Sequence, residues 1–109
     1  MTEKLKIDEF KKLELRVAEI LEASLHPNAD RLYVLKIKIG TEERQVVAGI
    51  RAHYTCDELR GKKVVVVSNL EPATIRGVES QGMVLAASEG DKLTLVTPER
   101  EINSGAVIR

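Results

Sequence analysis

Residues 69–87 read NLEPATIRGVESQGMVLAA, and the interpretation of the whole chain starts from them. Four consecutive valines at 64–67 precede this stretch, and its last residues, 83–87, are apolar. Because β-branched and apolar runs are typical of buried strands, we expect a strand on each side of a polar loop. Such loops often carry binding sites, although an ordinary strand connection has the same pattern. The loop backbone is punctuated by Pro72, Gly77 and Gly82.

Upstream of this stretch the pattern predicts three further strands. Leu15–Leu25 is long enough for one strand, but Leu15 and Val17 would lie on one face and Ile20 on the other. A β-bulge reconciles this change of phase. Residues 32–39 alternate apolar and polar side chains, and 44–50 are again strand-like after a turn at 40–43, which predicts a hairpin.

Two short helices and a tail complete the expected elements. Ile7, Phe10 and Leu13 have helical spacing near the N-terminus, and Thr55 and Glu58 have the spacing of a capping box. Strands are expected at 62–68, 83–88 and 92–97. The pattern of short strands with few helices predicts an all-β, five-stranded Greek-key barrel. We expect one domain, with an N-terminal helix at 1–14, the barrel at 15–97 and a C-terminal extension at 98–109.

Composition narrows the class of protein. The 109 residues are 43% hydrophobic, and this fraction suits a folded domain. Because 17 basic residues balance 17 acidic ones, the chain is not a polycation that coats nucleic acid. No apolar run approaches a membrane span, and the N-terminus lacks the apolar core of a signal peptide. The single cysteine, Cys56, excludes an internal disulfide. These features favour a cytoplasmic protein that does not bind membranes.

Signals for catalysis and cofactors are weak. His53 and Cys56 have a spacing seen in metal sites, but no second pair of ligands completes a set of four. No nucleophile elbow, phosphate-binding loop or dinucleotide fingerprint is present. We therefore expect no catalytic residue, no metal and no cofactor, so that the chain is not an enzyme.

Basic side chains on the predicted hairpin provide a physical basis for RNA binding. Lys36 and Lys38 project from one face of a strand, with Arg44 across the hairpin, and Arg51, His53 and Arg76 could join them, although a solvated charged face has the same pattern. The chain has only one phenylalanine and two tyrosines, so it lacks the stacking platforms that single-strand binders use. A structured RNA, recognised by shape and backbone, is the better match.

Residues spread over nearly the whole chain carry a family resemblance. The chain resembles the tRNA-binding domain at the C-terminus of methionyl-tRNA synthetases, which also occurs as free-standing tRNA-binding proteins. The resemblance implies an oligonucleotide-binding (OB) fold, with a short helix between strands three and four. The matching residues are Leu15, Arg16, Val17, His26, Pro27, Asn28, Ala29, Asp30, Leu32, Arg44, Gln45, Val46, Val47, Gly49, Ile50, Glu58, Leu59, Asn69, Leu70, Pro72, Ile75, Arg76, Gly77, Glu79, Ser80, Gly82 and Met83.

The resemblance also implies a partner and a site. Similar proteins bind the outer corner of folded tRNA with little dependence on its sequence. Met83 could offer an apolar contact to RNA, with packing in the core as the alternative. The predicted RNA-binding residues are Lys36, Lys38, Arg44, Arg51, Asn69, Arg76, Ser80, Gln81, Gly82 and Met83.

The expected function is non-catalytic tRNA binding by a homodimer. The dimer contacts would be Ile7, Phe10, Leu13, Val107 and Ile108, which are apolar residues outside the minimal barrel. The chain would be a β-subunit or appended domain of a methionyl-tRNA synthetase, with the catalytic chain as a partner, or a free-standing protein. Its start at Met1 without an obvious linker favours a separate polypeptide. The alternative is a protein-export chaperone of the same fold. Proteins of that chaperone group lack the full 26–30 turn and the 76–83 loop. A cytokine-like role is a third alternative.

Overall fold

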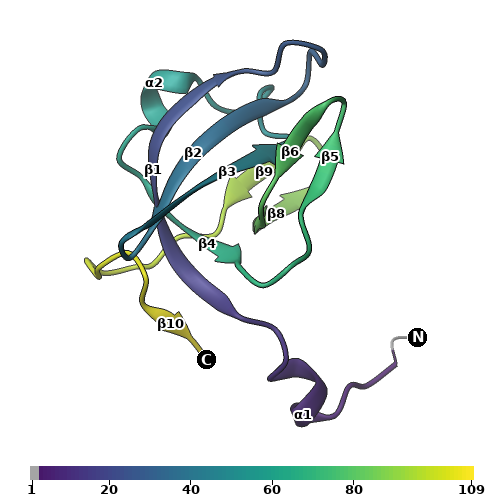
Figure 1. The fold of residues 1–109 in the computed structure, drawn as a ribbon, viewed down its shortest axis with the longest axis vertical. Helices are drawn as coiled ribbons and strands as arrows, with labels where there is room; N and C mark the ends of the chain where they lie inside the picture. Colours follow the sequence, from purple (N-terminus) through teal and green to yellow (C-terminus); the bar gives the residue numbers. More distant parts are fainter. Residues whose placement is uncertain (1–2) are drawn as a thin grey trace.

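A curled antiparallel sheet forms the body of the protein in the computed structural model, which describes residues 3–109 (Figure 1). Its strand order is β3-β2-β1-β4-β7, and β10 adds to β1. This five-stranded half-barrel is OB-like and confirms the predicted fold class. The strands are β1 Leu15–Leu25, β2 Tyr33–Ile39, β3 Glu42–Ala48, β4 Lys63–Val67, β7 Met83–Val84 and β10 Val107–Ile108.

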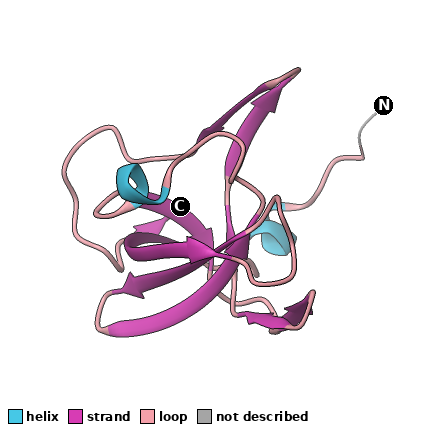
Figure 2. Ribbon diagram, turned by 90° about the horizontal axis from the view of Figure 1, so that it is seen from above, coloured by secondary structure: helices cyan, strands magenta, loops and turns pink. Residues whose placement is uncertain are grey.

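Two hairpins stand outside this sheet, and the helices are single turns (Figure 2). One hairpin pairs β5 Ala73–Ile75 with β6 Val78–Ser80, within the stretch predicted as a loop. The other pairs β8 Ala86–Glu89 with β9 Lys92–Leu95, so the strand expected at 83–88 is divided after β7. The division lies at Leu85, which donates its N–H to the Val65 oxygen and accepts from Val96. The helices are α1 Ile7–Phe10 and α2 Cys56–Leu59.

A bulge is present in β1, as predicted, but it lies after Ile20 and not between Val17 and Ile20, where the sequence pattern placed it. The register of β1 against β2 shifts between Ile20 and Glu22. Before the bulge β1 pairs with β4 and, at Glu19 and Ile20, also with β2; after it β1 pairs with β2 alone. A bulge bends a strand and increases its twist. The bulge between Ile20 and Glu22 therefore allows the single strand β1 to pair with both β4 and β2 in the curled sheet.

The core lies inside the curl and is closed by α2. The largest fully buried side chains include Ile20, Leu35 and Ile37 from the sheet and Leu59 from α2. The predicted capping box is present, because Thr55 Oγ accepts from Glu58 N at 3.3 Å and Glu58 Oε1 accepts from Thr55 N at 2.6 Å. The cap holds α2 so that Leu59 is buried, which stabilises the fold by about 1.5–3 kcal/mol.

The two ends of the chain are anchored differently. Gly105, with φ of 94°, lies so close to Gly40 that an added Cβ would be 2.9 Å from the Gly40 Cα. Arg16 Nη1 also donates to the Gly105 oxygen at 3.0 Å, so the tail is held beside β1. The N-terminal arm, residues 3–13, extends away from the body with its apolar side chains exposed (Figure 1). No helix within residues 3–109 is long and apolar enough to span a membrane.

Candidate nucleic-acid interface

The β5–β6 hairpin is closed by a two-residue turn at Arg76 and Gly77. Both residues have positive φ, 52° and 88°, which is the geometry of the turns that match the twist of a hairpin. Glycine and asparagine favour this conformation, and Arg76 is the only non-glycine residue with positive φ among the described residues. The sequence analysis missed this hairpin because the turn lacks the usual Asn-Gly or Asp-Gly pair.

Polar contacts to β3 hold the hairpin against the sheet. Gln45 Nε2 donates to the Glu79 oxygen at 2.9 Å, and the backbones of Gln45 and Gln81 are bonded at 2.8 Å. The Gln81 side chain accepts from Gln45 N at 3.0 Å. Ser80 is buried, and its hydroxyl accepts from Val47 N at 2.9 Å and donates to the Gly82 oxygen at 3.1 Å. The polar groups of Ser80 and Gln81 therefore have partners inside the protein.

Arg44 joins the two ends of the stretch. Its Nη1 donates to the Ser68 oxygen at 2.5 Å and to the Gln81 oxygen at 3.3 Å. Its guanidinium also pairs with both carboxylate oxygens of Glu42, and these hydrogen bonds hold the pKa of the Glu42 carboxyl below its ordinary value. The β2–β3 register places Arg44 opposite Ile37, which is buried. The prediction that Arg44 shares the face of Lys36 and Lys38 is wrong, because adjacent positions along a strand face opposite sides.

Asn69 connects the stretch to the base of the N-terminal arm. Its Oδ1 accepts from Glu14 N at 2.8 Å, and its Nδ2 donates to the Lys12 oxygen at 2.6 Å. The neighbouring Ser68 hydroxyl donates to Glu14 Oε1 at 2.7 Å. The Asn69 amide is thus engaged with the backbone. No pattern in the sequence pointed to Glu14 as its partner.

The turn that follows β1 is bonded to the hairpin tip. His26 is buried, and its Nδ1 accepts from Asn28 N at 2.9 Å, so the ring proton is on Nε2, which donates to the Ile75 oxygen at 3.0 Å. Asn28 Nδ2 donates to the Arg76 oxygen at 3.2 Å, and Arg76 Nη2 donates to the Asn28 oxygen at 3.3 Å. No pattern in the sequence predicted this role for His26.

An apolar groove runs along the inner side of the hairpin. One part, with a volume of about 200 Å³, is lined by residues that include Leu70, Ala73 and Ile75. The adjoining part, of about 350 Å³, includes Gly49 and Ile50 in its lining. Val47 and Met83 line both parts, so the two hollows adjoin at these residues, and we call the pair the Met83 groove. Met83 is 48% exposed, and this exposure argues against the alternative that it packs in the core.

The outer face of β2 is less basic than its lysines suggest. Lys36 lies opposite Glu22 on β1 and opposite Gln45 on β3. Lys38 lies opposite Glu19 on β1 and Glu43 on β3. Because directly opposed side chains share a face of the sheet, two lysines are surrounded by three carboxylates. This face is a poor surface for phosphates.

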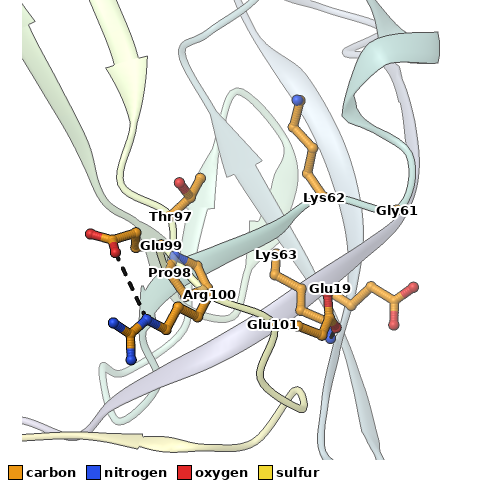
Figure 3. Close-up of a pocket in the computed structure, with 9 residues that line it drawn as sticks. All are labelled: Glu19, Gly61, Lys62, Lys63, Thr97, Pro98, Glu99, Arg100 and Glu101. Carbon is orange, nitrogen blue, oxygen red and sulfur yellow. Dashed lines mark hydrogen bonds and ion pairs between the residues drawn. The ribbon is translucent and has the colours of Figure 1, made fainter.

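The largest hollow, of about 540 Å³, lies between the segment at 61–63 and the tail at 97–101 (Figure 3). Lys63 is ion-paired with Glu101, and Arg100 Nε lies 3.9 Å from Glu99 Oε1. Glu19 also lines the hollow, while the Lys62 amino group points away from these carboxylates (Figure 3). Its charges are mixed and largely satisfied within the protein, so this hollow is a weaker candidate than the Met83 groove.

The curled half-barrel, with a hairpin docked beside an apolar groove, defines an OB-like domain of the kind that binds nucleic acids. Residues 15–107 match the family described as "Putative tRNA binding domain", and the chain belongs to this family. The chain is 55% identical over 102 residues to the methionine–tRNA ligase of Thermococcus kodakarensis. This match covers 94% of the chain but only 14% of the ligase.

Solved structures match the fold over nearly its full length. A MetRS-related protein from Pyrococcus horikoshii has a TM-score of 0.91 and 36% identity, and the match covers 99% of this chain and 100% of that one. A CsaA chaperone protein from Picrophilus torridus has a TM-score of 0.90 and 33% identity, with coverage of 97% and 100%. Proteins with different named roles therefore share this fold.

Proposed function

We propose that this chain binds folded tRNA without catalysing a reaction. The family match over residues 15–107 carries this proposal. The chain would act as an appended domain or β-subunit of a methionyl-tRNA synthetase, with the catalytic chain as its partner, or as a free-standing cytoplasmic protein. By holding tRNA near a catalytic site, such a domain raises the effective concentration of the substrate.

The aromatic residues support recognition of folded RNA. Tyr33 is buried and its hydroxyl donates to the Tyr54 oxygen at 2.7 Å. The Tyr54 hydroxyl in turn accepts from Leu95 N at 3.0 Å. Both tyrosines are thus engaged in closing the barrel, and the remaining aromatic residue, Phe10, is on the N-terminal arm. Without rings to stack on successive bases, contact through the RNA backbone and shape is favoured.

The internal contacts divide the predicted RNA-binding residues into two groups. Arg44, Asn69, Ser80 and Gln81 have their polar groups engaged within the protein, so in this proposal they position the loop. Lys36 and Lys38 are left out because of the carboxylates around them. The residues proposed to contact RNA are Arg51, Arg76, Gly82 and Met83.

A homodimer forms part of the proposal. Ile7, Phe10 and Leu13 on the arm and Val107 in β10 are exposed, while Ile108 is partly buried. Exposed apolar groups near one another commonly mark an interaction surface. Two barrels related by a two-fold axis would present two copies of the groove to one RNA.

The test is a gel-shift titration with one tRNA in two states. The folded transcript, with magnesium, should bind, and the same transcript unfolded by heating without magnesium should bind more weakly. Equal binding of both states would contradict recognition by shape. Absence of binding to the folded transcript would contradict the proposed function.

The chaperone function is the second candidate, supported by the match to a CsaA chaperone protein. An apolar groove could accept an unfolded segment of another protein. Suppression of the aggregation of a denatured test protein, measured with and without tRNA, distinguishes the two functions. Suppression in a chain that fails to bind folded tRNA would favour the chaperone.

A further inference from the structure

We propose that Arg31, Arg51 and Arg76 form a phosphate-binding rim beside the Met83 groove. This inference rests on the proposed function and assigns the chemistry within it: the arginines bind backbone phosphates of folded tRNA, while the groove contacts a ribose or the face of a base. Arg31 had no assigned role in the sequence analysis. The three arginines come from three separate loops.

Each arginine is next in sequence to a residue at the groove. Arg76 follows Ile75 and Arg51 follows Ile50, and both isoleucines line the groove. Arg31 precedes Leu32, whose Cδ2 would be 3.6 Å from a Cβ added at Gly49, another lining residue. One residue of chain spans at most about 3.6 Å, so each arginine begins within a few ångströms of the groove wall.

Hydrogen bonds hold two of these loops together. His26 is bonded to the Ile75 oxygen at 3.0 Å, and Asn28 is bonded to Arg76 in both directions. The loop after β1 and the tip of the β5–β6 hairpin accordingly lie side by side at the upper right of Figure 1. The backbone segments that carry Arg31 and Arg76 are therefore held side by side.

The local charge suits an anionic ligand. The segments 26–32, 49–54 and 75–78 contain three arginines and one acidic residue, Asp30, which leaves a net charge of +2 with histidines neutral. Glu71, which lines the groove, lowers the local net charge to +1. Within the described part of the chain, none of the three arginines forms an ion pair. The Lys36 and Lys38 face, by contrast, has three carboxylates around two lysines. Phosphates should therefore prefer the rim.

The backbone of Arg76 provides independent support. A non-glycine residue with positive φ is unfavourable, and such residues are concentrated at functional sites. Asparagine or glycine would suit this turn better, and the arginine adds to it a positive charge and one hydrogen bond to the Asn28 oxygen. One Arg76 N–H bonds to Asn28, and a guanidinium has five, so the group retains donors for a phosphate.

The experiment compares rim variants with a matched control in the full chain. The rim variants are Arg31→Gln, Arg51→Gln and Arg76→Asn, where the last creates an Asn-Gly turn that favours the hairpin. The control is the double variant Lys36→Gln, Lys38→Gln, which removes two positive charges from the surface, where each rim variant removes one. Each protein is melted to confirm folding and then titrated with one folded tRNA at several salt concentrations.

Each rim variant should bind roughly tenfold more weakly, as expected for loss of a charged hydrogen bond. Its slope of log affinity against log salt should be shallower by about 1, since one fewer phosphate is neutralised. The control should stay within about twofold of the parent. If the rim variants match the parent, or weaken without a change of slope, the inference is wrong and the proposed function stands. If the parent itself fails to bind folded tRNA, both are wrong.

Discussion

His26 and Ile75, 49 residues apart in the chain, are joined by a hydrogen bond of 3.0 Å from the imidazole Nε2 to the backbone oxygen. The other ring nitrogen accepts from Asn28 N, so one buried imidazole orders the turn after β1 and holds the tip of the β5–β6 hairpin. The hairpin is thus held at its tip by this turn and along its length by β3.

His26→Ala should destabilise the protein by about 1–3 kcal/mol, because the Asn28 N–H and the Ile75 oxygen lose their partner and a buried side chain is truncated. Denaturant unfolding measures the loss, and amide exchange at 73–80 should become faster. The control is His53→Ala, at an exposed position, which should stay within about 0.5 kcal/mol of the parent. An unchanged exchange rate in His26→Ala would show that the imidazole does not hold the hairpin.

Ser80→Ala should also lower stability by about 1–3 kcal/mol, because the part-buried Val47 N–H loses its acceptor. Affinity for tRNA should fall only as far as the hairpin becomes disordered. Ser88→Ala, at an exposed position of β8, is the control. A variant that keeps the parent's stability but binds tRNA more weakly would instead indicate direct contact between the Ser80 hydroxyl and RNA.

Met83→Ala should weaken tRNA binding about fivefold, which corresponds to about 1 kcal/mol for removing a half-exposed apolar side chain from the interface. Its melting temperature should change little, because Met83 is 48% exposed. Val96→Ala, at an exposed position away from the groove lining, controls for general loss of apolar surface. Early melting with normal binding of the folded fraction would make Met83 a core residue.

Gly105→Ala should destabilise the docked C-terminal tail, since the new Cβ would lie 2.9 Å from the Gly40 Cα and the residue has positive φ. Gly61→Ala is a close control: its φ of 88° imposes a similar backbone cost, but nothing lies within 4 Å of the added Cβ. The difference in unfolding free energy between the two variants isolates the steric effect. Equal values would mean that the tail shifts without cost.

Phe10→Asp should convert the proposed dimer into a monomer, because it places an unpaired charge in an apolar contact. Light scattering at micromolar concentration should give about twice the 12.1 kDa chain mass for the parent and the single mass for the variant. Lys11→Asp changes the charge of an adjacent polar position and serves as the control. A monomeric parent would contradict the dimer.

Local patterns in the sequence were sufficient for most of the strands. Alternation at 32–39 and the valines at 64–67 predicted β2 and β4, because side-chain direction in a strand follows from neighbouring residues alone. The capping box was predicted for the same reason, since Thr55 and Glu58 are within one helical turn. The bulge in β1 was expected between Val17 and Ile20 but lies after Ile20, because its place depends on the pairing with β2.

The functional surface depended on contacts between distant residues, which only the tertiary structure determines. The β2–β3 register turned Arg44 away from the lysines, and the carboxylates of β1 and β3 offset the charge of Lys36 and Lys38. Asn69 found its partner Glu14 across 55 residues of sequence. Arg31 lies near the β5–β6 hairpin because the loop at 26–32 is hydrogen-bonded to the hairpin tip through His26 and Asn28. Composition shows which charges exist, but folding decides which are neutralised, buried or left free for a partner.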